Sequence, residues 1–66
     1  MNDAEYKYYV AKVTDVQGKV HHDWTVATGL HDAGRRFDEE YGGVVYSIDG
    51  PFDTENEAKG FIERMK

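Results

Sequence analysis

Histidine is the side chain best suited to metal binding or proton transfer near neutral pH, and the spacing of the three histidines favours neither. His21 and His22 are adjacent in a segment that reads as a strand, so their side chains point to opposite faces and cannot bind one ion together. His21 and Asp23 share a face, but His31 would have to supply a third ligand from elsewhere. No metal-ligand spacing of a known motif is present. We therefore expect neither a metal nor another cofactor.

Nucleophilic catalysis also lacks a source. Ser47 is the only serine, it lies inside a predicted strand, and the chain contains no cysteine. Carboxylates are plentiful, but general acid–base chemistry needs a pocket that shifts their pKa values. A chain of 66 residues has little room for such a pocket. We expect a protein that is not an enzyme.

The acidic side chains are unevenly distributed along the chain. Residues 1–37 contain five acids and five bases, whereas residues 38–66 contain eight acids and three bases and account for the whole net charge of −5. No base occurs between residues 38 and 58. Because such a field repels phosphate backbones, we expect no direct binding of nucleic acid. A solvated face and an interaction surface remain as explanations.

The acids of the second half fall into two groups at the ends of predicted helices. Those at residues 53–57 lie in or just before a first helical turn, where the helix dipole favours negative charge. The others lie in a last turn, the unfavourable end, although Arg35 and Arg36 are spaced to pair with two of them. This second set, which folding does not explain, is Asp38, Glu39 and Glu40.

The separation of the two acidic groups indicates one class of function. The strand between them should be about six residues long, which places the groups roughly 20 Å apart at opposite ends of the sheet. Separated anionic patches on a small rigid body imitate a nucleic-acid backbone. The pattern favours a small inhibitor whose carboxylates, Asp49 included, engage the basic groove of a nucleic-acid-binding complex. Phage proteins that block restriction or CRISPR effectors are of this kind.

Two segments read as the strands of a hairpin. Residues 6–16 and 20–28 are rich in Tyr, Val and Thr, and Gln17-Gly18 lies between them. A two-residue turn there would place Ala11 opposite Trp24 and an opposite-charge pair on the other face. The strongly apolar face would then contain Tyr9, Ala11, Val13, Val20, His22, Trp24 and Val26.

The first helix should cover residues 30–41. Thr28 is its expected N-cap, and Gly42-Gly43 is a strong stop signal. Residues 44–48 then alternate between apolar and polar side chains and read as a third strand. The apolar stripe of this helix is Leu30, Ala33, Phe37 and Tyr41.

A second helix begins near Thr54. Thr54 and Glu57 form a capping box, and Glu55 with Lys59 is an i,i+4 ion pair. Gly60 lies inside this helix and costs about 1 kcal/mol relative to alanine. The core-facing stripe of the second helix is Ala58, Phe61, Ile62 and Met65.

These elements predict an α+β fold of order ββαβα. Each helix has one apolar stripe and the hairpin has one strongly apolar face, so we expect a two-layer sandwich with both helices on the same side of the sheet. A crossover from the second strand to the third, beside the first, gives the strand order 2-1-3. The other face of the sheet should then be open.

The open face is the second candidate interaction surface. Two tyrosines and two valines in one uncovered patch are more than a solvated face requires. A homodimer or an accessory subunit would bury this patch against a partner sheet. The residues expected to bind a partner here are Tyr6, Tyr8, Val10 and Val45.

One segment resembles a known family. Residues 46–54 read YSIDGPFDT and, with the following Glu57-Ala58, resemble the second strand-to-helix unit of SPOR domains, which bind septal peptidoglycan. The resemblance covers about twenty residues and implies peptidoglycan binding as a third alternative. The rest of the chain departs from the family pattern, because a SPOR domain begins with a strand and a helix, whereas residues 6–28 read as a hairpin.

Length and composition complete these expectations. The 66 residues form one domain, with residues 1–5 disordered and a core built from packing alone, since there are no disulfides. Five Tyr, three Phe and one Trp supply large buried areas. No apolar run reaches the length of a membrane span, and no export leader is visible. We expect a cytoplasmic protein that binds another protein.

Overall fold

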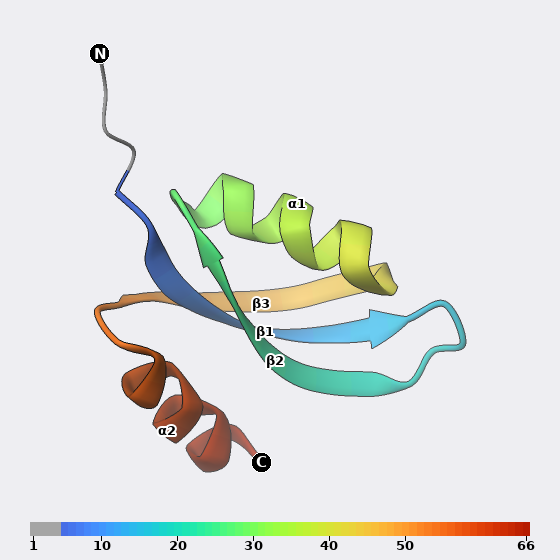
Figure 1. Cartoon of the computed structure of the whole chain (residues 1–66). Helices are drawn as coiled ribbons and strands as arrows, with labels where there is room; N and C mark the ends of the chain where they lie inside the picture. The colour runs from blue at the N-terminus through green and yellow to red at the C-terminus, as the bar shows by residue number, and fades with distance from the viewer. Residues whose placement is uncertain (1–4) are drawn as a thin grey trace.

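The computed structural model describes residues 5–66. The elements are β1 (Lys7–Asp15), β2 (Val20–Ala27), α1 (Leu30–Tyr41), β3 (Gly42–Phe52) and α2 (Glu55–Met65). The strands form an antiparallel sheet in the order β2-β1-β3 (Figure 1). The α+β class, the element order and the strand order 2-1-3 are therefore confirmed. The expected disorder of residues 1–5 falls, apart from Glu5, outside the described residues.

The two helices lie on opposite faces of the sheet, so the expectation of both helices on one face is wrong. Helix α1 packs against Tyr9, Ala11 and Val13 of β1. Helix α2 packs against Val10, with Tyr8 beside it. Because neighbouring residues of a strand point to opposite faces, these contacts place one helix on each side, as Figure 1 shows. The result is three layers, in which the sheet lies between the two helices and β1 is its central strand.

The turn of the hairpin explains the error. The loop contains three residues between Asp15 and Lys19, whose backbone groups pair across it at 3.0 Å, and Gly18 adopts a positive φ of 84°. This is a three-residue turn with a glycine bulge, and the two-residue turn expected at Gln17-Gly18 does not form. The Asp15 carboxylate stabilises it, because Oδ1 accepts hydrogen bonds from the backbone N–H groups of Gln17 and Lys19.

One extra residue in the turn shifts β2 by one position relative to β1. Ala11 pairs with Asp23, and Val10 pairs with Trp24. Since the side-chain period of a strand is two, this shift moves Trp24 to the face of Tyr8 and Val10. There Trp24 lies against Tyr8, with 5.6 Å between their ring centroids, beneath α2.

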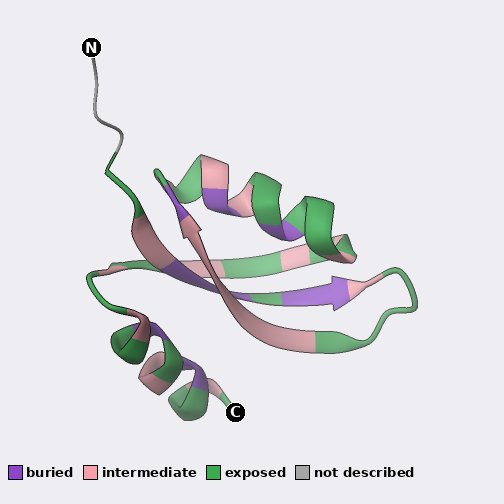
Figure 2. Cartoon of the chain, viewed as in Figure 1, coloured by how far each residue is buried: buried purple, intermediate pink, exposed green. Residues whose placement is uncertain are grey.

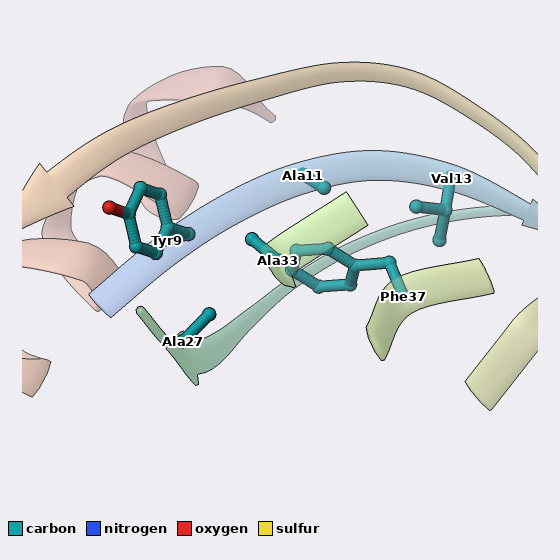
Figure 3. Packing of buried hydrophobic residues seen from close by; sticks show 6 residues of the cluster. All are labelled: Tyr9, Ala11, Val13, Ala27, Ala33 and Phe37. Carbon is teal, nitrogen blue, oxygen red and sulfur yellow. The ribbon is translucent and has the colours of Figure 1, made fainter. Parts of the chain in front are cut away.

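The core between α1 and the sheet is small and tightly filled. Phe37 is fully buried among the alanines and valines of this cluster (Figure 3). Gly34 gives Ile48 of β3 room, because a Cβ on residue 34 would lie 3.3 Å from its Cδ1 atom. Leu30 is 56% exposed and lies outside the stripe in which the sequence placed it. The buried members of the cluster are Tyr9, Ala11, Val13, Ala27, Ala33 and Phe37.

The start of α1 also differs from expectation. Gly29 is the N-cap, and it makes no side-chain cap hydrogen bond, so Thr28 is not the cap. Instead Asp32 Oδ2 accepts from the backbone N–H of Thr28 at 3.1 Å. The expected end is confirmed, because Gly42 adopts the left-handed conformation and donates its N–H to the Asp38 carbonyl.

Strand β3 is longer and less regular than the six residues expected. It runs for 11 residues and its pairing with β1 shifts register at three points. One shift leaves Tyr46 unpaired between Val45, opposite Val13, and Ser47, opposite Lys12. As a result Val45 packs with the α1 cluster rather than lying on an open face.

Helix α2 forms as the sequence predicts. Thr54 Oγ1 accepts from the Glu57 N–H at 3.2 Å, and the Glu57 carboxylate accepts from the backbone N–H of Asp53. Glu55 and Lys59 pair at 2.6 Å. Buried Ala58 and Ile62 face the sheet, whereas the outer surface of the helix is exposed (Figure 2).

The three-layer arrangement predicts which truncations destabilise the protein. Ile62 is 7% exposed beneath α2, so Ile62→Ala should lower the free energy of unfolding by about 2 kcal/mol or more. Leu30→Ala is the matched control and should cost far less, since Leu30 is 56% exposed. Urea denaturation followed by Trp24 fluorescence measures both. Equal losses would contradict the packing described here.

Replacement of two glycines by alanine should change the free energy of unfolding in opposite directions. A Cβ at Gly60 meets no atom within 4 Å, so Gly60→Ala should raise the free energy of unfolding by about 1 kcal/mol through helix propensity. A Cβ at Gly43 would collide with the backbone carbonyls of Thr14 and Asp15, so Gly43→Ala should destabilise the protein. Thermal unfolding of both variants would test this, and a destabilising Gly60→Ala would contradict it.

Candidate functional site

The acids at the end of α1 form an exposed corner. We call Asp38, Glu39 and Glu40 the acidic corner, and all three are exposed. The last turn of α1 contains no basic residue, so the helix end leaves their charge uncompensated. Among residues 5–66, no salt bridge or side-chain hydrogen bond involves them.

Most other acids of the described chain are engaged by a neighbour. Surface lysines pair with four of them, and the remainder bond to arginine, histidine, tyrosine or backbone groups. Asp49 is the exception outside the corner. The engaged acids are Glu5, Asp15, Asp23, Asp32, Asp53, Glu55, Glu57 and Glu63.

The arginines of α1 do not reach the corner, and the expected pairing with Glu39 and Glu40 is wrong. Arg35 and Arg36 turn back toward the N-terminus of the helix and bond to Asp32 at 3.1 and 3.0 Å. Asp32 lies in the first turn and also accepts from Thr28, so one carboxylate gathers all three donors. These hydrogen bonds, led by that of Thr28, hold the pKa of Asp32 well below its ordinary value.

Each acid of the second group is engaged by a neighbour within the fold. Asp53 bonds to Lys7 at 2.7 Å, which lowers the Asp53 pKa and raises that of Lys7. The other two acids of this group complete a cap and an ion pair of α2. The strand between the two groups, β3, has 11 residues rather than the six expected and spans up to about 35 Å. A pair of equivalent anionic patches is therefore not present.

Asp49 lies on β3, apart from the corner. It pairs with Val10 of β1 and so lies on the face of the sheet that α2 covers. It is partly exposed, and within residues 5–66 no salt bridge or hydrogen bond to its carboxylate occurs.

The expected open face does not exist where the sequence placed it. Val10 is fully buried beneath α2, and Tyr8 is partly buried beside it. Val45 belongs to the opposite face, against α1. Tyr6 is 55% exposed and lies beside Arg36 of α1, 5.9 Å from its guanidinium carbon to the ring centroid. The four residues therefore do not form one surface, and dimerisation through that face is not supported.

A different apolar surface is exposed at the hairpin end of the sheet. We call it the distal patch, and sequence reasoning missed it because the hairpin register and the bulge at Tyr46 decide which side chains reach it. The sequence contained one sign of this surface, the run Gly42-Gly43-Val44, in which two small residues precede an apolar strand. The patch consists of Val20, Val44 and Tyr46, which are 47%, 54% and 58% exposed, and Val16 of the adjoining turn is 81% exposed.

A cluster of polar side chains ties the hairpin to the end of α1. His21 donates from Nε2 to Asp15 Oδ2 at 2.9 Å, and its ring lies 4.9 Å from that of Tyr41. The Tyr41 hydroxyl donates to Asp23, and burial together with this hydrogen bond raises the Tyr41 pKa. His21 therefore serves the turn and does not join Asp23 as a metal ligand. Residues 5–66 contain no group of three or more potential ligands placed to hold a metal.

Two searches, one for membrane-spanning helices among the described residues and one for similar proteins, found nothing. In the part of the chain that the structure describes, no helix combines the length and apolar character needed to cross a membrane. Comparison with family models, curated proteins and solved structures gave no match.

The turn predicts a dependence of stability on pH. Hydrogen bonds from His21 and from the Lys19 and Gln17 N–H groups lower the pKa of Asp15 from 3.8 to about 2. A depressed folded-state pKa stabilises the fold above the unfolded-state value and loses this effect as the pH falls through the folded one. The loss of stability in Asp15→Asn should be largest above about pH 5 and shrink toward about pH 2. Urea denaturation across this range measures it, and a pH-independent difference would contradict it.

Proposed function

We propose that this chain is a non-enzymatic protein-binding domain whose acidic corner engages a basic surface on a larger protein. The supporting observation is the contrast among its acids. The corner residues are exposed and without a basic partner in the described chain, whereas nearly all the other acids are engaged. Three like charges at the C-terminal end of a helix repel one another and oppose the helix dipole. A cationic partner would relieve both effects.

We further propose that the partner is a nucleic-acid-binding complex and that the chain inhibits it by occupying its basic groove. The net charge of −5 favours association with a positive surface and disfavours association with nucleic acid itself. The engaged second acidic group assigns this role to the corner, with Asp49 as an additional charge. Complexes of this kind act in the cytoplasm, where we place the protein.

The corner can be tested with a defined cationic probe. Titration of the ¹⁵N-labelled protein with a hexa-arginine peptide at low salt should shift the amide signals of residues 38–40 most strongly. The variant Asp38→Lys/Glu39→Lys/Glu40→Lys should weaken binding about tenfold or more, and added salt should weaken the wild-type interaction.

A charge-matched control separates the corner from the net charge. Glu5, Glu55 and Glu63 are acids that pair with lysines. Their replacement by lysine changes the net charge by the same amount but leaves the corner intact. If this triple variant loses binding as strongly as the corner variant, or if the shifts spread evenly over all acids, the proposed function is wrong.

A further inference from the structure

The distal patch lies on the same side of the sheet as α2, beyond the end of that helix. Helix α2 packs over Tyr8, Val10 and Trp24, near the start of β1. Lys12 and Thr14, the next side chains of β1 on this face, are outside that cluster, and Figure 1 shows the hairpin end of the sheet extending past the helix. Half of this face is therefore covered by a helix and half is not.

Two of the patch residues flank Thr14 on the uncovered half. Val20 lies opposite Thr14 on β2, and the backbone N–H of Val44 on β3 donates to the Thr14 hydroxyl at 2.9 Å. Thr14 is 6% exposed, although no helix covers it, because its neighbours on both strands shield it. Val20 and Val44 remain about half exposed themselves, so their apolar surface is available to a partner.

Tyr46 is the aromatic member of the patch and its bulge sets its direction. The residue is unpaired in the ladder, and its ring lies 5.7 Å from the Lys12 ammonium. The ring therefore already accepts a cation on its surface. Tyr46 is still 58% exposed, and an exposed tyrosine is a typical central contact of protein interfaces.

The turn between α1 and β3 joins the acidic corner to the patch around the edge of the sheet, since α1 lies on the opposite face. The corner residues precede Gly42, whereas Val44 and Tyr46 follow it. Three residues lie between Glu40 and Val44, so their Cα atoms are at most about 14 Å apart. A partner surface that spans this edge of the sheet would contact the unpaired acids and the exposed apolar side chains together, an arrangement of charged rim and apolar centre that interfaces share.

The charge of the chain decides between two occupants of the patch. A second copy would bring a net charge of −5 against another −5, including two acidic corners. A basic partner would instead gain from the same charges. We propose that the distal patch is the apolar anchor of the interface whose charged rim is the acidic corner. Its occupant is a basic protein surface that presents an aromatic or aliphatic side chain among arginines or lysines. This inference rests on the proposed function.

Two blocked peptides of equal charge, RRWRR and RRGRR, test the anchor. The wild-type protein should bind RRWRR about threefold to tenfold more tightly than RRGRR, and only RRWRR should shift the side-chain signals of Val20, Val44 and Tyr46. Tyr46→Ser should remove this advantage without changing the affinity for RRGRR, and Tyr46→Phe should retain it. Tyr6→Ser is the matched control, because Tyr6 is similarly exposed and also has a cation near its ring.

Any other outcome overturns the inference. The two peptides and the corner variant together distinguish a failure of this inference from a failure of the proposed function. Equal affinity for the two peptides, or tryptophan-dependent shifts at α2 instead of the patch, would refute the anchor. If the signals of the patch residues change with protein concentration in the absence of peptide, the patch binds a second copy of the chain, and the proposed anchor is refuted. If the corner variant loses RRGRR binding while tryptophan gives no gain, only the anchor fails. If the corner variant still binds RRGRR normally, the proposed function fails as well.

Discussion

The hydrogen bonds of the Asp15 carboxylate at the hairpin turn fix the register on which the rest of the structure depends. They hold three residues in the loop, and that number places Trp24 opposite Val10. Once Trp24 lies on the face of Tyr8 and Val10, both faces of the sheet contain apolar side chains and each needs a cover. The helices then occupy opposite sides, and a core forms on each.

The class, the element order and the strand order could be predicted from local patterns, but the layering could not. Capping residues, glycine stops and helical spacing act within a few residues, and they placed the elements well. Register is set by a single turn, and a change of one residue in that turn moves every side chain of β2 to the other face. The sequence does contain one sign of the answer. The run from Tyr8 to Ala11 is continuously apolar, which is typical of a strand buried on both faces.

The acidic corner was predicted from charge position, whereas the apolar surface was not. Helix ends and their dipoles are local, so three acids in a last turn stand out in the sequence without coordinates. Which acid an arginine pairs with is less easily predicted from local sequence. Arg35 and Arg36 have acids within reach on both sides, and Asp32 prevails because it also bonds to the Thr28 backbone. The distal patch depends on a bulge and on where α2 ends, and neither follows from side-chain periodicity.

The Asp23 carboxylate has a consequence for how far the sheet can grow. Backbone pairing of Asp15 with Lys19 places Trp24 among the residues of β2 whose N–H groups face away from β1. The Trp24 N–H donates to Asp23 Oδ1 at 2.8 Å, while Tyr41 holds the other oxygen. A strand approaching this edge would find its central donor occupied and a negative charge beside it. Asp23 therefore disfavours the addition of a further strand at the β2 edge, as the bulges and Pro51 do at the β3 edge.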